Sequence, residues 1–364
     1  MPILLNEQKN VDVQAGVYMM QTGHNPSSSP ITPNVSSRIR YLSVFFTMCI
    51  ICYHCGSDSS PSRLNSLAND MFAGLGTLAM SYFFTVTGLL LHNSLNPKTY
   101  CRKIKSRVTT LLLPYLWWQI LFTALFVFRG MSYSPSNWIS TVFLFDAWPP
   151  DGALWYVYAV FCLSLLSFLG FPLAKYRHQV FYIILLLFPA LHYMTNQISA
   201  GNTSYLGYGY LGNIISYLPS YLIGSFFGSI GRDESTNYLR KLALPALLII
   251  PLAVERPELI AWCELRLLPI LLLYAGPTSG RITTVTIQPI QNLTFIMYAI
   301  HQPFLIICGS QLRSLVEKDF LHPLISNVLY RVVVLACVIL ISRLIRMIVS
   351  KASPTLLKLF TGGR

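Results

Sequence analysis

Two histidines that stand in long apolar runs are the first candidates for chemistry. His54 ends an apolar run that starts at Tyr41, and His301 stands in the segment from Phe295 to Pro303. An ionisable side chain inside a membrane-spanning helix is costly, and it marks a proton path, a bound ion or a reacting group. The alternative is a core histidine that hydrogen-bonds a neighbouring helix. The desolvation cost favours a functional role for His54 first and for His301 second.

The composition places these histidines in a membrane protein. Of 364 residues, 54% are hydrophobic and only 11% are charged, and the mean hydropathy is +0.54. Soluble domains carry about 25% charged residues, so a soluble protein is excluded. The formal net charge of +13 comes mostly from Lys and Arg in short loops between apolar runs. This placement indicates membrane topology, with lipid as a partner, and no nucleic acid is expected.

Apolar runs long enough to cross about 30 Å of hydrocarbon predict an all-α, polytopic bundle. We expect ten spans, at about 40–57, 71–92, 108–129, 152–173, 179–196, 208–230, 240–254, 259–276, 291–311 and 326–349. Lys and Arg concentrate in alternate loops, which predicts that both termini are cytoplasmic. The expected parts are a flexible cytoplasmic tail over 1–37, a transmembrane domain over 38–350 and a short basic cytoplasmic tail over 351–364. Nothing in the sequence indicates an oligomeric state.

Helix rise gives the depth of the two histidines in this topology. His54 lies 14 residues beyond Arg40, which corresponds to about 21 Å from the cytoplasmic end at 1.5 Å per residue. His301 lies roughly 15 Å into its own span by the same arithmetic. The two imidazoles are therefore expected to meet at a similar level.

Cysteines such as Cys49 and Cys52 stand within apolar runs, where a thiol packs as a small hydrophobe, so no metal site is expected.

A basic segment before the third span is the second candidate for binding. Its cations are Lys98, Arg102, Lys103, Lys105 and Arg107. Arginine side chains and a helix start would suit a phosphate-bearing ligand. Composition alone favours the simpler interpretation, in which these cations mark the cytoplasmic side or contact anionic headgroups.

Two further residues have two interpretations each. Trp155, near a predicted span end, belongs to the aromatic belt at the membrane interface or provides a platform on which a sugar stacks. Glu264 stands two residues from Arg266, so the two do not share a helix face and do not pair. Glu264 either orients an imidazole or binds substrate, or it lies at the solvated end of a short helix.

Five segments in register resemble the acyltransferase 3 family of integral membrane acyltransferases. They are the first span ending in His54, Phe83–Gly88, Arg107–Tyr115, Leu154–Tyr156 and Phe295–Pro303. The resemblance covers about residues 38–349. It implies transfer of an acetyl group from cytoplasmic acetyl-CoA to a sugar hydroxyl of a cell-envelope polysaccharide or lipopolysaccharide. The acceptor would be a glycan or glycolipid, acetyl-CoA would be a cosubstrate with no permanently bound cofactor, and a bacterial inner membrane would be the usual location.

The resemblance also implies roles for particular residues. His54 corresponds to the essential histidine, acting as a general base or as a transient acyl acceptor. Arg107, Arg102, Lys103 and Lys105 are the candidate CoA contacts. The family commonly has an arginine eleven residues before the histidine, where this chain has Ser43. The nearest cations are Arg40 and Arg38. Either the basic role has moved along the helix, with Arg40 as the candidate, or the protein binds its donor differently.

Two other classes of protein remain as alternatives. In a proton-coupled secondary transporter or exporter, His54, Glu264 and His301 would relay protons. Such transporters often contain two similar halves, and no repeat relates the first five spans to the last five. A non-catalytic carrier of the same fold is the third alternative, because Ser43 departs from the family pattern.

Overall fold

The computed structural model describes residues 31–56, 63–93, 95–132, 134–143, 149–183, 210–230, 235, 237–239, 257–275, 287–316 and 322–363. Within these ranges the chain is helical and contains no strand. The main helices are α2 (Pro33–His54), α3 (Arg63–His92), α4 (Pro97–Arg107), α5 (Leu113–Phe128), α6 (Pro135–Phe143), α7 (Trp155–Leu166), α9 (Tyr210–Ser229), α11 (Pro257–Ala275), α13 (Thr294–Val316), α14 (Pro323–Ala352) and α15 (Pro354–Thr361). The predicted all-α bundle is confirmed in this form.

Six helical segments in the described ranges are long and apolar enough to cross a membrane. They are Pro33–His54, Asn65–His92, Pro97–Phe128, Gly152–Gly170, Thr294–Val316 and Pro323–Ala352. They correspond to predicted spans one to four, nine and ten. α9 and α11 coincide with predicted spans six and eight, and spans five and seven lie mostly outside the described residues. Ten spans and cytoplasmic termini remain predictions.

Local sequence explains where several helices begin. Thr32 caps α2 by accepting a hydrogen bond from the Val35 N–H, and Pro33 occupies the first turn, where a missing N–H costs nothing. Asn96 and Thr99 form a reciprocal capping box at the start of α4. A π-helical turn over Val108–Leu112 joins α4 to α5 without a loop.

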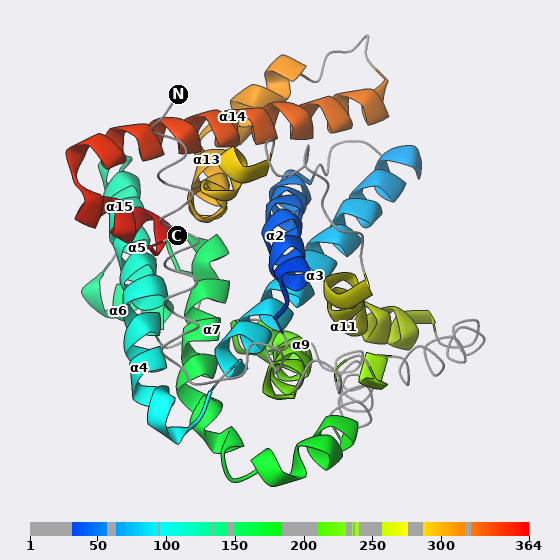
Figure 1. Cartoon of the computed structure of the whole chain (residues 1–364). Helices are drawn as coiled ribbons and strands as arrows, with labels where there is room; N and C mark the ends of the chain where they lie inside the picture. The colour runs from blue at the N-terminus through cyan, green and yellow to red at the C-terminus, as the bar shows by residue number, and fades with distance from the viewer. Residues whose placement is uncertain are drawn as a thin grey trace, which may run out of the picture.

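The helices α2 and α3 lie at the centre, with α4 to α7 on one side and α11 on the other (Figure 1). α3 and α9 pack with their backbones in direct contact. A Cβ added to Gly224 would lie 2.0 Å from the Thr85 carbonyl oxygen, and one added to Gly88 would lie 2.2 Å from that of Tyr221. Small residues permit such approach in membrane bundles, where van der Waals packing holds helices together.

The last three helices cover one end and one side of this arrangement. α13 and α14 pack on each other and run across the C-terminal end of α2 (Figure 1). After α14 the chain turns at Ser353, which caps α15 by accepting hydrogen bonds from Thr355 and Leu356. α15 packs on α5, where Trp118 Nε1 donates to the Phe360 carbonyl at 3.3 Å. Residues 354–361 are therefore a docked helix.

Candidate active site

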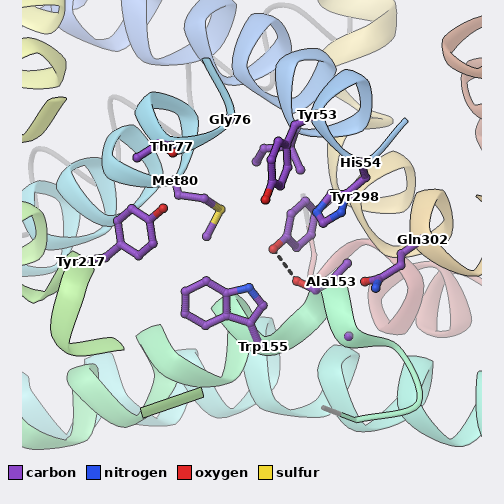
Figure 2. A pocket seen from close by; sticks show the side chains of 12 residues that line it. Tyr53, His54, Gly76, Thr77, Met80, Ala153, Trp155, Tyr217, Tyr298 and Gln302 are labelled. Atoms are coloured by element: carbon purple, nitrogen blue, oxygen red, sulfur yellow. Dashed lines mark hydrogen bonds between the residues drawn. The ribbon is translucent and has the colours of Figure 1, made fainter. Parts of the chain in front are cut away.

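A cavity of about 440 Å³ lies where α2, α3, α9, α13 and the start of α7 converge. Figure 2 shows His54 and Tyr298 on one wall, Met80 and Tyr217 on the opposite wall, and Trp155 between them. The lining residues are Ile50, Tyr53, His54, Gly76, Thr77, Met80, Gly152, Ala153, Trp155, Tyr217, Tyr298 and Gln302. Most are apolar or aromatic, with a few polar groups, as in sites that bind small organic ligands.

His54 and His301 meet beside this cavity. Their ring centroids are 5.0 Å apart, so the predicted common level of the two imidazoles agrees with the geometry. The His54 side chain is exposed at the last residue of α2, whereas that of His301 is fully buried. His301 Nδ1 lies 2.7 Å from the Tyr298 carbonyl oxygen, which can only accept. A neutral His301 therefore carries its proton on Nδ1 and presents the lone pair of Nε2.

The Nε2 atom of His301 is enclosed and has no hydrogen-bond partner within the described part of the chain. Buried polar atoms are nearly always satisfied, and exceptions often belong to reactive groups. The enclosed acceptor of His301 lies beside the exposed imidazole of His54. In this pair the His54 ring can contact a ligand, and the His301 ring can support the His54 ring.

Two arginines from α13 and α14 hold the end of α2 that carries His54. Arg331 donates to the Cys52 carbonyl, and Arg313 donates to the carbonyls of Cys55 and Gly56. The last carbonyls of a helix have no partner within it and carry partial negative charge. Cationic donors at this end therefore fix the direction from which His54 enters the cavity.

Arg331 is itself held by a buried polar network. It is 2% exposed, donates to Asn69 and Asn327, and lies with its guanidinium 4.3 Å from the centroid of the Phe72 ring. Asn327 in turn donates to Asn65. These partners are neutral, so hydrogen bonds and the α2 terminus compensate the guanidinium charge.

The cavity wall opposite the histidines is aromatic, and residues packed behind it hold its rings in place. Tyr217 stacks on Phe84 with ring centroids 5.4 Å apart, and the Trp155 ring lies 6.1 Å from Tyr217. Arg266 of α11 lies over the Tyr217 ring at 4.8 Å and donates to Ser81 and Ser216. Trp155 thus lies in the cavity wall, where its face could contact a ring-shaped ligand.

The segment that precedes α7 forms the floor and contains a buried acid. The Tyr298 hydroxyl donates to the Ala153 carbonyl at 2.5 Å. Gln119 binds both backbone polar groups of Asp151 at 3.0 Å, which fixes the turn before Gly152. The Asp151 side chain is fully buried, and neither carboxyl oxygen has a hydrogen-bond partner of ordinary geometry in the described ranges. Burial raises the pKa of this carboxyl well above its usual range, and the Ala153 N–H offsets part of the rise.

The basic residues of α4 lie away from the cavity, at the other end of α3. Lys103 Nζ donates to the carbonyls of Leu91 and Asn93 at 2.6 and 2.5 Å, so it caps the C-terminal end of α3. Arg102 and Lys105 are exposed, and Arg107 is half-buried. None of the predicted CoA contacts lines the cavity. We call this surface, made by Arg102, Lys103, Lys105 and Arg107, the basic rim.

The position at which the resemblance expects arginine is occupied by a polar contact. Ser43 donates to the Ile39 carbonyl at 2.7 Å and lies 3.1 Å from the Tyr82 hydroxyl. Arg38 donates to the carbonyls of Leu273 and Tyr274 near the end of α11. Arg40 is exposed on α2. Glu264 belongs to α11, but its side chain lies outside the described residues.

Sequence reasoning missed four residues of the site: Tyr217, Tyr298, Gln302 and Asp151. Tyr298 stands three residues before His301, and Gln302 directly follows His301. Their closeness to His301 in one helix is the sequence feature that could have indicated them. Asp151 stands four residues before Trp155, immediately before an apolar run, where an acid is typical of a solvated loop.

The sequence matches a family model described as an acyltransferase domain over residues 37–347, which is most of the chain. No curated protein and no solved structure matches the chain significantly.

Proposed function

Because the chain belongs to the acyltransferase 3 family of membrane acyltransferases, we propose that it transfers an acetyl group from cytoplasmic acetyl-CoA to a sugar hydroxyl. The acceptor is a cell-envelope polysaccharide or lipopolysaccharide, and the location is a bacterial inner membrane. The observation that carries the proposal is the pair of imidazoles, with ring centroids 5.0 Å apart, at a cavity inside a helical bundle that can span a membrane.

His54 is the catalytic group in this proposal, because it is the exposed member of the pair. Its neutral imidazole takes the proton of the attacking hydroxyl, or it accepts the acetyl group briefly itself. His301 lies close enough to relay a proton or to orient the first ring. The aromatic wall of Trp155 and Tyr217 supports binding of a sugar ring next to His54.

The donor reaches this cavity from the basic rim. Met80 lines the cavity, and His92 ends α3 beside the carbonyls that Lys103 binds. The helix rise between these two positions is about 18 Å. An extended pantetheine arm suits this separation if Arg102, Lys105 and Arg107 hold the CoA phosphates, with Arg40 as a further cation. Guanidinium groups favour bidentate phosphate binding.

The test is mass spectrometry of cell-envelope glycans from cells that express the wild type or His54→Ala. We expect the acetylated glycan to disappear in the variant while protein abundance in the membrane is unchanged. His322→Ala is a matched control, because His322 is exposed at the start of α14, and it should leave acetylation intact.

Identical acetylation in wild type and His54→Ala would remove the enzyme assignment. A lower amount of the glycan in the envelope, with the same acetyl content per glycan, would indicate transport. We expect His301→Ala to retain more activity than His54→Ala, because His301 acts through the first imidazole. Equal and complete loss would show that the two rings act as one unit.

A further inference from the structure

Gln302 offers the cavity an amide that the protein does not use. It follows His301 on α13 and lines the cavity together with His54. Its Oε1 atom is enclosed without a partner, and its Nε2 atom is neither enclosed nor hydrogen-bonded within the described residues. The amide N–H groups are therefore available to a ligand.

Gly152 leaves room for the amide in this position. A Cβ at Gly152 would lie 3.1 Å from both the nitrogen and the oxygen of the Gln302 amide. Figure 2 shows this amide directed toward the backbone of the 152–153 segment. That segment is fixed by Gln119 at Asp151 and by Tyr298 at Ala153. The amide is thus confined between a rigid turn and its own helix.

Two hydroxyl donors around the cavity already serve the protein. Tyr298 donates to the Ala153 carbonyl, and Thr77 donates to the Ala73 carbonyl. Neither can bind a ligand oxygen without breaking that bond. Gln302 has no such bond to give up, so a ligand oxygen can engage it without breaking a hydrogen bond between the described residues.

We propose that the side-chain amide of Gln302 is a catalytic donor that stabilises the oxyanion of the acyl-transfer reaction. The inference rests on the proposed function. When the acceptor oxygen bonds to the acyl carbon, the hydroxyl proton passes to His54 and the carbonyl electron pair moves onto oxygen. Gln302 donates an N–H to that oxygen. The pair then returns, the C–S bond breaks, and the CoA thiolate takes the proton from His54.

A route through an acetyl-histidine needs the same donor. His54 first attacks the thioester, and the carbonyl oxygen again becomes negative before the C–S bond breaks. A donor placed before the reaction begins gains most as charge develops, which is the basis of oxyanion stabilisation. The amide carries no charge of its own, so it is buried at little cost compared with a cation.

The experiment measures transfer from radiolabelled acetyl-CoA into the glycan fraction of membranes that contain the wild type or Gln302→Leu. Loss of one oxyanion donor lowers kcat by about 100-fold to 1,000-fold. We expect that loss with little change in the KM for acetyl-CoA and in the melting temperature. Gln311→Leu makes the same change at an exposed position of α13 and should behave as the wild type.

Gln302→Glu keeps the size of the side chain but replaces its N–H donors by acceptors, so it should be at least as slow as Gln302→Leu. This variant also tests the proposal if the leucine variant is not stable. A kcat within about threefold of the wild type in either variant, or a raised KM with unchanged kcat, would overturn the inference. Absence of transfer by the wild type would instead reject the proposed function.

Discussion

Cations at the two ends of the cavity-bearing bundle are used in different ways. Around the cavity, Arg331 and Arg266 are almost fully buried, and both bind backbone carbonyls and neutral side chains. At the basic rim, Arg102 and Lys105 are exposed to solvent. Buried guanidinium groups therefore shape the walls of the site, and the exposed cations remain available for a charged ligand. Lys103 is the exception at the rim, because it caps α3.

The strongest test of this contrast is Arg331→Met, which keeps the apolar part of the side chain and removes the charge. It removes one donor each from the Cys52 carbonyl and from the side-chain oxygens of Asn69 and Asn327. Each buried neutral acceptor left unsatisfied costs about 1–3 kcal/mol. We expect a large drop in melting temperature in detergent and loss of transfer. Arg343→Met, at an exposed position of α14, should change neither.

The contact between α3 and α9 connects the two ends, and Gly224→Ala tests it. The new methyl would collide with the Thr85 carbonyl, so the helices must separate. Overpacking costs about 1–3 kcal/mol, measurable by thermal unfolding. The matched control is Gly74→Ala on α3, where a Cβ would meet nothing within 4 Å. A higher helix propensity should stabilise the control by up to about 1 kcal/mol. Equal effects of the two variants would contradict the close approach.

The rim is tested by Arg107→Ala, for which we expect the KM for acetyl-CoA to rise about tenfold. That change corresponds to one charge-assisted hydrogen bond to phosphate. The affinity for the glycan acceptor should change less, and kcat should remain close to that of the wild type. An unchanged donor KM would move the donor site away from α4, as would a CoA photolabel that maps to another surface.

The last comparison concerns Asp151, whose effect on stability depends on pH. Its raised pKa means that the folded protein keeps this proton to a higher pH than the unfolded chain does. The acid therefore lowers stability as pH rises above the unfolded value of about 3.9. Asp151→Asn removes that penalty, so its melting temperature should exceed that of the wild type at pH 7 and approach it near pH 4. A gain that does not depend on pH would show that the pKa of Asp151 is the same in the folded and the unfolded protein.

Much of this arrangement could be predicted from hydrophobic run length and helix rise. Both quantities are properties of a single helix. They predicted the transmembrane helices and the common level of His54 and His301. The roles of Arg331 and Arg266 depend on which helices cross, and periodicity does not specify crossing. The cost of burying an ionisable group in an apolar run singles out the histidines. Gln302 carries no charge, so this argument does not single it out. The Gly152 backbone, which accommodates its amide, is visible only in three dimensions.

The π-helical turn at Val108–Leu112 sets the direction in which the cations of the basic rim face. The Leu113 N–H bonds to the Val108 carbonyl, five residues back, so this turn contains one residue more than an α-helix needs. Each residue of an α-helix turns the chain by about 100°. Deleting Thr109 would convert the turn to regular helix and rotate every cation of α4 about the common axis, while the composition of the rim stayed the same. Register alone, without any change in charge, would then decide whether these side chains face the donor or the lipid.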